Sequence, residues 1–470
     1  MYLNLFLVIF VLTQVKSDLI LKKHGPPDVD APKLRVDPPT WGTIQQRVDH
    51  FNPKDARKWE MRYLESGQFF EENGPMFIYL GGEWSINMGS IMSGQIVDMA
   101  LEHRGYLFYT EHRYYGQSFP TEDLSPENLQ YLNVDQALAD VVYFINYKKE
   151  TIPGLKSSKV VVVGGSYSAS MATWLRLKYP HAIDIAYASS GPLRAVADFH
   201  EYYEVINDNI KLVNSECLQT INDGTNLMEK EMETEDGLKS LSERLGMCNT
   251  LKNEEPHRSF FFNMIIAETF AGLVQYAGQY SIQNDCDKLM GFDGDALNKL
   301  IGYIKDNYKD VSCIGDYDEF IETYSSHETS NDIYRQWIYQ TCTEYGYFQT
   351  TTSQYQPFGD TFPLNFFVDM CPTLFGERFN ETVLNTAVRR TNLFYGSIEP
   401  EITKLISVHG SVDPWHPLGI LSDLSPLAPA IFIEGSSHCA DLKSVSEYDI
   451  PALREAKIRI KGIIAEWLKE

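Results

Sequence analysis

The 470-residue sequence is poor in basic residues. It contains 40 lysines and arginines against 64 aspartates and glutamates, which gives a formal net charge of −24. Because this charge repels phosphate backbones and anionic lipid headgroups, we expect neither a nucleic acid nor a membrane as a partner. The chain is still 43% hydrophobic, and it is long enough to bury a large core in two or more structural units.

Long apolar runs are equally scarce. After Leu3–Leu12, no stretch approaches the roughly 18 uncharged apolar residues that a membrane-spanning helix needs. Leu3–Leu12 is itself too short, and Lys16 and Ser17 follow it, so we expect a signal peptide over residues 1–17. A buried N-terminal strand is the alternative. A signal peptide predicts a protein of the secretory pathway, either secreted or lysosomal.

The seven cysteines form no CxxC pair, which argues against a zinc site. We expect neither a metal nor a cofactor. Six of the cysteines lie between positions 217 and 371, and Cys439 stands apart. In an oxidising compartment this distribution predicts a disulfide-stapled middle region with Cys439 left over. The sequon Asn380-Glu381-Thr382 predicts glycosylation of Asn380.

Strand and helix signals alternate in two parts of the chain, and alternation of this kind predicts a parallel sheet. Between them the sequence is charged, mostly helical and rich in cysteine. We therefore predict an α/β core over residues 40–194 and 391–470, interrupted by a disulfide-stapled helical cap domain over residues 195–390. The expected strands lie within 75–83, 106–110, 159–165, 183–191, 404–410 and 428–435, and the expected helices lie within 133–150, 167–179 and 451–470.

A serine follows one of these apolar runs, in the segment VVVVGGSYSAS at residues 160–170. A strand, a tight turn that holds a serine and an immediate helix are the parts of a nucleophile elbow. A phosphate loop or a dinucleotide fold would need the pattern G-x-x-x-x-G-K-[ST] or G-x-G-x-x-G, and the segment has neither. The favoured interpretation is a nucleophilic Ser166.

A serine nucleophile needs a base, and the base needs an acid that orients it. In α/β-hydrolases the acid and then the histidine follow the serine, each on a loop after a later strand. Asp413 and His438 follow successive strand signals in this order. His416 is the competing base, and His409 is expected to be structural. Taken singly, Asp413 could form an Asx-turn, and His438 could be an ordinary loop histidine.

The tetrahedral intermediate of such a reaction needs an oxyanion hole. We expect one donor to be the backbone N–H of Tyr167, the residue after the nucleophile, and the other to come from the segment GGEWS, at Gly82. A simple tight turn is the alternative for GGEWS. Glu83 could bind a substrate ammonium. Arg113 could bind a carboxylate, although a structural ion pair is favoured for it.

Several long motifs are spread over most of the mature chain, among them GGEWS, EHRYYGQSFP, GGSYSASMATWLRLKYP, WIYQTCTEYGYFQT, HGSVDPWH and GSSHCADL. They resemble the serine exopeptidase family that comprises prolyl carboxypeptidase, dipeptidyl peptidase II and thymus-specific serine protease. The segment YQTCTEYGYF is most similar to the thymus-specific branch.

The resemblance implies an α/β-hydrolase core with a large helical cap inserted between the nucleophile and the acid/base strands. It implies a Ser166–Asp413–His438 triad and hydrolysis of peptides near proline or small residues through an acyl-enzyme. Trp415 would line the substrate pocket, and packing of a partly buried aromatic is the alternative. The family's cysteine pattern implies the disulfides Cys217–Cys286, Cys248–Cys313 and Cys342–Cys371, with Cys439 free.

The chain departs from the family at two points. Ser168 stands where the elbow usually ends in glycine or alanine, and a cysteine pair found in some relatives after the CTE segment is missing. The second departure leaves the substrate specificity open. We expect a serine exopeptidase of the dipeptidyl-peptidase or carboxypeptidase type, with a homodimer as one option for its assembly. An esterase or lipase on the same fold, or a catalytically silent binding protein, are the alternatives.

Overall fold

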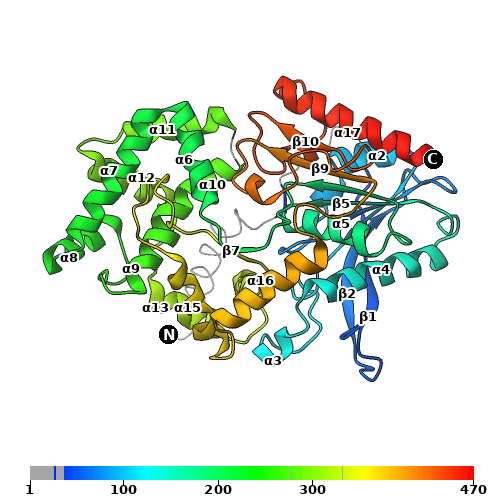
Figure 1. The fold of residues 1–470 in the computed structure, drawn as a ribbon, viewed down its shortest axis with the longest axis horizontal. Helices are drawn as coiled ribbons and strands as arrows, with labels where there is room; N and C mark the ends of the chain where they lie inside the picture. The colour runs from blue at the N-terminus through cyan, green and yellow to red at the C-terminus, as the bar shows by residue number, and fades with distance from the viewer. Residues whose placement is uncertain (1–25, 28–35, 277, 331) are drawn as a thin grey trace. The chain divides into compact units, whose positions relative to one another are not determined.

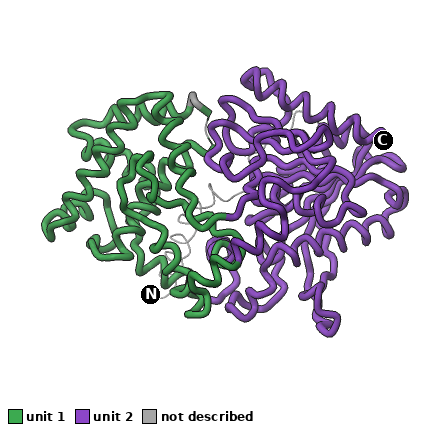
Figure 2. The backbone as a smooth tube through the Cα atoms, in the orientation of Figure 1, with its two compact units in different colours: residues 1–24, 196–326, 341–386 green, residues 25–195, 327–340, 387–470 purple. Residues whose placement is uncertain are grey.

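The computed structural model describes residues 26–27, 36–276, 278–330 and 332–470. The predicted signal peptide, residues 1–17, lies outside the described residues. The described chain divides into two compact units, coloured separately in Figure 2: unit 1 holds residues 196–326 and 341–386, and unit 2 holds the others. The limits 195–390 for a cap domain stay a prediction, and residues 327–340 within them group with unit 2.

Unit 2 is built on an eight-stranded sheet of order β1-β2-β4-β3-β5-β6-β9-β10. From β4 to β10 neighbouring strands pair in parallel, whereas β2 is antiparallel to both β1 and β4. One antiparallel strand in an otherwise parallel sheet, with helices between the strands, is the α/β-hydrolase arrangement, so the predicted fold class is confirmed. The strands are β1 (Thr40–Arg47), β2 (Lys58–Ser66), β3 (Met76–Leu80), β4 (Tyr106–Thr110), β5 (Val160–Gly165), β6 (Ile185–Ser189), β9 (Leu405–Gly410) and β10 (Ala430–Ile433).

Helices cover both faces of the sheet, so the central strands β3, β5, β6 and β9 are buried along their whole length and are mostly apolar. Successive side chains of a strand point to opposite faces. Phe77, Val161 and Ile185 pack in one core cluster with residues of α2 and α17, while α5 packs on β5 and β6. Figure 1 shows α2 and α17 on one side of the sheet and α4 and α5 on the other.

The helices of unit 2 begin where the sequence signals them. The Asn133 side chain accepts the N–H of Gln136 and caps α4, and Pro451 occupies the first turn of α17. The helices are α2 (Gln95–Glu102), α3 (Pro126–Leu129), α4 (Val134–Thr151), α5 (Tyr167–Lys178), α14 (Tyr334–Gln340), α17 (Pro451–Lys469) and α16 (Glu381–Tyr395), which crosses the boundary between the units.

Unit 1 is mostly helical, with a two-stranded parallel sheet of β7 (Val196–Asp198) and β8 (Gly346–Phe348). Its helices are α6 (Glu201–Val213), α7 (Ser215–Glu231), α8 (Glu235–Leu245), α9 (His257–Phe260), α10 (Glu268–Tyr276), α11 (Gln279–Met290), α12 (Ala296–Asn307), α13 (Tyr317–Ser325) and α15 (Leu364–Phe375), together with π-helical turns η2 (Phe261–Ala267) and η3 (Thr341–Tyr345).

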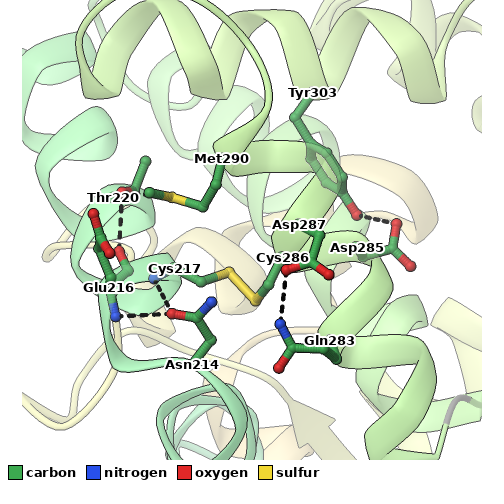
Figure 3. Close-up of a disulfide and its surroundings, with 10 residues drawn as sticks. All are labelled: Asn214, Glu216, Cys217, Thr220, Gln283, Asp285, Cys286, Asp287, Met290 and Tyr303. Atoms are coloured by element: carbon green, nitrogen blue, oxygen red, sulfur yellow. Dashed lines mark hydrogen bonds between the residues drawn. A yellow bond between two sulfur atoms is a disulfide. The ribbon is translucent and has the colours of Figure 1, made fainter.

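Three disulfides staple unit 1: Cys217–Cys286, Cys248–Cys313 and Cys342–Cys371. These are the pairs that the family resemblance implies. Figure 3 shows the first of them, which joins α7 to α11 beside the Asn214 cap of α7. Cys439, in unit 2, is free and buried.

The β1–β2 hairpin was not among the expected strands. Most side chains of β1 are exposed at the sheet edge, so its sequence TWGTIQQR has no apolar run to reveal it. No helix within the described ranges is both long and apolar enough to cross a bilayer.

Candidate active site

Ser166 lies in the turn between β5 and α5, with a left-handed backbone at φ +58° and ψ −133°. The turn needs glycine before it, because a Cβ on Gly164 would lie 2.1 Å from the carbonyl oxygen of Ser168. The Ser168 hydroxyl accepts the N–H of Gly165 at 3.0 Å and donates to the Gly165 carbonyl at 2.9 Å. This is the strand–turn–helix geometry of a nucleophile elbow, and the two hydrogen bonds of Ser168 to Gly165 stabilise the turn.

Asp413 and His438 follow β9 and β10, which are parallel neighbours in the sheet. The Nδ1 atom of His438 lies 2.8 Å from Oδ1 of Asp413, and both side chains are buried. The backbone N–H of Trp415 donates to the same oxygen at 3.0 Å. The imidazole is therefore held through Nδ1, which directs its other nitrogen away from the acid.

Burial alone would suppress both charges of this pair. The charge and hydrogen bond of His438 nevertheless lower the pKa of Asp413 below its ordinary value. In the same way, burial opposes protonation of His438, but the Asp413 carboxylate raises the pKa of His438 well above its ordinary value. The Asp413 carboxylate thus stabilises the imidazolium form of His438, the form that a catalytic base has once it has taken up a proton.

The end of β6 joins the Ser166 turn to the His438 loop. The carbonyl oxygen of Ser189 accepts the N–H of Ser166 at 2.9 Å and the S–H of Cys439 at 3.6 Å. The hydroxyl of Ser190 accepts the N–H of Cys439 at 2.9 Å. Two consecutive residues of one strand end therefore hold the predicted nucleophile and the residue after the predicted base.

A buried carboxyl group strengthens this junction. Asp441 accepts the hydroxyls of Tyr187 and Ser189, each at 2.6 Å, and its own carbonyl accepts Nε2 of Gln95 at 2.7 Å. Burial raises the pKa of Asp441. The 3₁₀ turn that follows His438 is thereby fixed to β6.

The sequence analysis did not assign a role to Ser189, Ser190 or Asp441. The only signal for them was polar residues directly after a strand, in the segments ASSG and HCAD. Such residues are common in turns and do not name their partners. Their roles follow from hydrogen bonds that span about 250 positions of sequence.

The two other histidines of this region have different surroundings. The Nδ1 atom of His416 contacts the backbone carbonyl of Asp413 at 2.8 Å, and its ring packs edge-on against Phe432. His409 is buried in β9, and burial lowers its pKa to about 4. Of these three histidines, only His438 hydrogen-bonds the Asp413 carboxylate.

The segment GGEWS follows β3, at the same carboxyl-terminal end of the parallel strands as the Ser166 turn. Its first glycine, Gly81, already donates its N–H to the Thr110 carbonyl at 2.8 Å, which leaves Gly82 as the candidate donor there. Glu83 is buried, and this burial raises its pKa to about 8, against the opposing charge of His438. Glu83 therefore lies within electrostatic range of the predicted base.

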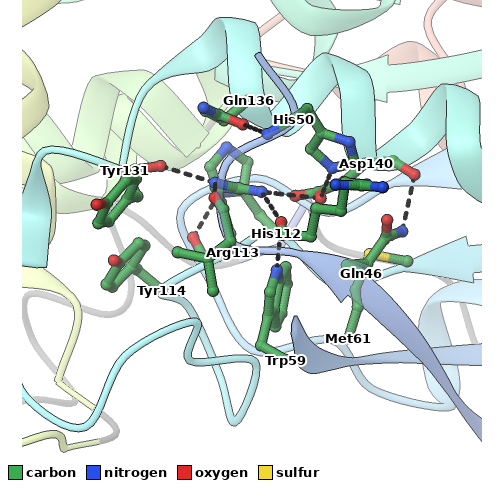
Figure 4. A network of polar contacts seen from close by, with 12 residues as sticks. Gln46, His50, Trp59, Met61, His112, Arg113, Tyr114, Tyr131, Gln136 and Asp140 are labelled. Carbon is green, nitrogen blue, oxygen red and sulfur yellow. Dashed lines mark hydrogen bonds and ion pairs between the residues drawn. The ribbon is translucent and has the colours of Figure 1, made fainter. Parts of the chain in front are cut away.

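Arg113 is completely buried and has a structural role (Figure 4). Its guanidinium donates to both oxygens of Asp140 at 2.7 and 2.9 Å, and its three other N–H bonds go to backbone carbonyls. All five donors are used within the protein. The idea that Arg113 binds a substrate carboxylate is therefore wrong, and the ion-pair interpretation holds.

Comparison with known proteins places the chain in a family. The sequence profile of serine carboxypeptidase S28 matches residues 46–460. The chain belongs to the peptidase S28 family. It is therefore a serine peptidase.

Among its S28 relatives, the thymus-specific serine protease of Mus musculus is 32% identical over 95% of this chain and 89% of the relative. The Homo sapiens protein of that name is 31% identical over 92% of this chain and 87% of the relative. The lysosomal Pro-X carboxypeptidase of Mus musculus is 27% identical over 90% of this chain and 88% of the relative.

Proposed function

We propose that Ser166, His438 and Asp413 are the catalytic triad of this S28 peptidase. The observation that carries the proposal is the 2.8 Å hydrogen bond between His438 and Asp413 at the ends of adjacent parallel strands. The Ser166 turn is bonded to the same strand end, Ser189–Ser190, as the residue after His438. Both observations support a triad at the carboxyl-terminal ends of the parallel strands β5, β9 and β10.

In the proposed reaction, Ser166 Oγ attacks the carbonyl carbon of the scissile peptide while its proton passes to Nε2 of His438. The N–H groups of Tyr167 and Gly82 stabilise the oxyanion. When the C–N bond breaks, His438 gives the proton to the leaving nitrogen and an acyl-enzyme remains. In the second half of the reaction, water attacks the acyl-enzyme carbonyl while His438 takes its proton. His438 then returns the proton to Ser166 Oγ as the ester bond breaks, which releases the carboxylic acid product. Asp413 keeps the Nδ1 proton in place and stabilises the imidazolium.

We further propose that this protein is an exopeptidase that cleaves peptides near proline. Its similarity to a relative named Pro-X carboxypeptidase and to the thymus-specific serine proteases supports this proposal. Trp415 is proposed to line the pocket for the residue before the scissile bond. Glu83 is proposed to accept the substrate amino terminus if the enzyme releases dipeptides.

A secretory or lysosomal location is part of the proposal. Three disulfides require an oxidising compartment for their formation, and several relatives are named lysosomal. Asn380 is exposed at the start of α16, where a glycan would be accommodated. Glycosylation and a homodimer remain predictions.

Labelling with a fluorophosphonate, combined with a library of proline-containing peptides at pH 5 and pH 7, tests the triad and the reaction. We expect labelling and cleavage by the native protein, and neither by Ser166→Ala. Peptides blocked at the amino or the carboxyl end distinguish dipeptide release from carboxypeptidase action. Labelling that survives in Ser166→Ala refutes the triad, and ester turnover without peptide cleavage favours an esterase.

A further inference from the structure

The side chain of Tyr167 is held from two directions inside unit 2. Its hydroxyl lies 3.1 Å from Nε2 of His112 and 3.0 Å from Nε2 of Gln340. Tyr115 donates its hydroxyl to Oε1 of Gln340 at 2.6 Å, and Trp337 packs on the Tyr167 ring with 5.8 Å between centroids. All five side chains are buried.

The contact between His112 and the Arg113 carbonyl, at one end of this network, determines where its protons lie. The Nδ1 atom of His112 lies 2.7 Å from the carbonyl of Arg113, which can only accept, so Nδ1 carries the proton. Burial lowers the pKa of His112 to about 4, so the imidazole is neutral and Nε2 is an acceptor. The hydroxyl of Tyr167 therefore donates to His112 and accepts from Gln340. Each polar group has a single orientation.

Tyr167 matters because of its place in the chain. It is the first residue of α5, and its backbone N–H comes directly after Ser166. The Ser166 backbone lies in a region that non-glycine residues seldom adopt and that costs about 1–3 kcal/mol. Such a conformation persists only where the surroundings hold it. The carbonyl of the peptide that follows Ser166 accepts the N–H of Ala169 at 2.9 Å, so this peptide moves with the first turn of α5, and the Tyr167 side chain fixes where that turn lies.

We propose that His112 and Gln340 are positioning residues for the oxyanion hole: by clamping the Tyr167 side chain, they aim the Tyr167 backbone N–H at the substrate oxyanion. The proposal rests on the proposed function, in which this N–H is an oxyanion donor. An oxyanion donor acts in the transition state, and loss of one typically costs about 10²–10³ in kcat. A donor N–H that no longer points at the oxyanion should lose part of this transition-state stabilisation.

The test measures kcat and KM for a peptide that the native protein cleaves, in His112→Phe, Tyr167→Phe and the double variant. Tyr63→Phe is the matched control, because it removes another buried tyrosine hydroxyl of unit 2, which accepts from Lys148. We expect kcat to fall by about 10- to 100-fold in each of the first two, with KM within about twofold. The double variant should be no worse than the poorer single variant, since both remove one clamp.

Two further readouts separate positioning from a loss of folding. A peptide boronic acid, which bonds to Ser166 Oγ and becomes a tetrahedral anion, should bind the clamp variants more weakly by the same factor as the loss in kcat. His112→Gln, which keeps a neutral acceptor, should recover most of the activity. Melting temperatures of the clamp variants should resemble that of Tyr63→Phe.

A kcat loss no larger than that of Tyr63→Phe, an effect confined to KM, or additive losses in the double variant would each overturn the inference. These results require an active native protein whose turnover depends on Ser166. If Ser166→Ala retains native turnover, the proposed function itself fails, and the two failures are therefore distinguishable.

Discussion

Removal of Asp140 should destabilise unit 2 more than almost any other single change to a polar group. The carboxylate holds the buried Arg113 guanidinium through two hydrogen bonds, and its Oδ1 also lies 2.7 Å from Nε2 of His50. The Asp140→Ala variant leaves the Arg113 charge buried without a counter-charge. Because an arginine side chain is effectively always charged in proteins, the folded variant bears the full free-energy cost of burying an unpaired charge.

Breaking a buried pair by removing one partner costs about 3–5 kcal/mol. At roughly 2 °C per kcal/mol for a unit of this size, the melting temperature should fall by roughly 6–10 °C. The matched control is Glu71→Ala, which breaks the surface ion pair with Arg104, where both side chains are more than half exposed. Such a pair contributes at most about 1 kcal/mol.

Scanning calorimetry and thermal unfolding followed by fluorescence provide the measurement, with fluorophosphonate labelling of Ser166 at 20 °C as the check that the site survives. A melting temperature of Asp140→Ala equal to that of Glu71→Ala would contradict this expectation, because it would mean that Arg113 is solvated or finds another partner. Besides Asp140, the network in Figure 4 offers the Arg113 guanidinium backbone carbonyls and the Trp59 ring, and neither carries a negative charge.

The pH dependence of this effect has a defined sign. Burial opposes ionisation of Asp140, but the Arg113 charge lowers its pKa below the unfolded value. The carboxylate therefore stabilises the fold fully above about pH 4, and this contribution is lost as the pH falls through the folded pKa. The difference in melting temperature between the native protein and Asp140→Ala should shrink below pH 4.

Three other changes test separate parts of the structure. Gly164→Ala places a Cβ 2.1 Å from the Ser168 carbonyl and should slow fluorophosphonate labelling by more than about tenfold; unchanged labelling would mean that the elbow can relax. Replacing Cys217 and Cys286 by serine opens a 69-residue separation and should cost roughly 4 kcal/mol, seen as a lower melting temperature of unit 1. An unchanged melting temperature would contradict this. Glu83 has its pKa raised to about 8, so the folded state retains a proton that the unfolded chain loses above about pH 4.5. The melting temperature of Glu83→Gln relative to the native protein should therefore rise from pH 5 to pH 8, and a flat difference would show that Glu83 ionises normally.

Local sequence pattern was sufficient to predict the central strands of the sheet and the turn that holds Ser166. The run Val160–Val163 is apolar because β5 is covered on both faces, and the two glycines and Ser166 follow because a tight turn must begin there. The order of Ser166, Asp413 and His438 along the chain carried the expectation of a triad, since each residue follows a strand that can be recognised from its own composition.

Contacts between distant groups could not be predicted from local sequence pattern and became known from the fold. The β1–β2 hairpin was missed because β1 is mostly exposed and has no apolar run. The grouping of residues 327–340 with the sheet unit depends on contacts between distant segments, which hydrophobic periodicity does not predict. The bonds of Ser189 and Ser190 to the His438 loop, and of His112 to Tyr167, are equally non-local. Burial periodicity is a property of a short stretch, whereas a hydrogen-bond partner is chosen when the whole chain folds. Hence the sequence indicated the residues of the proposed triad, and the fold determined which groups hold them.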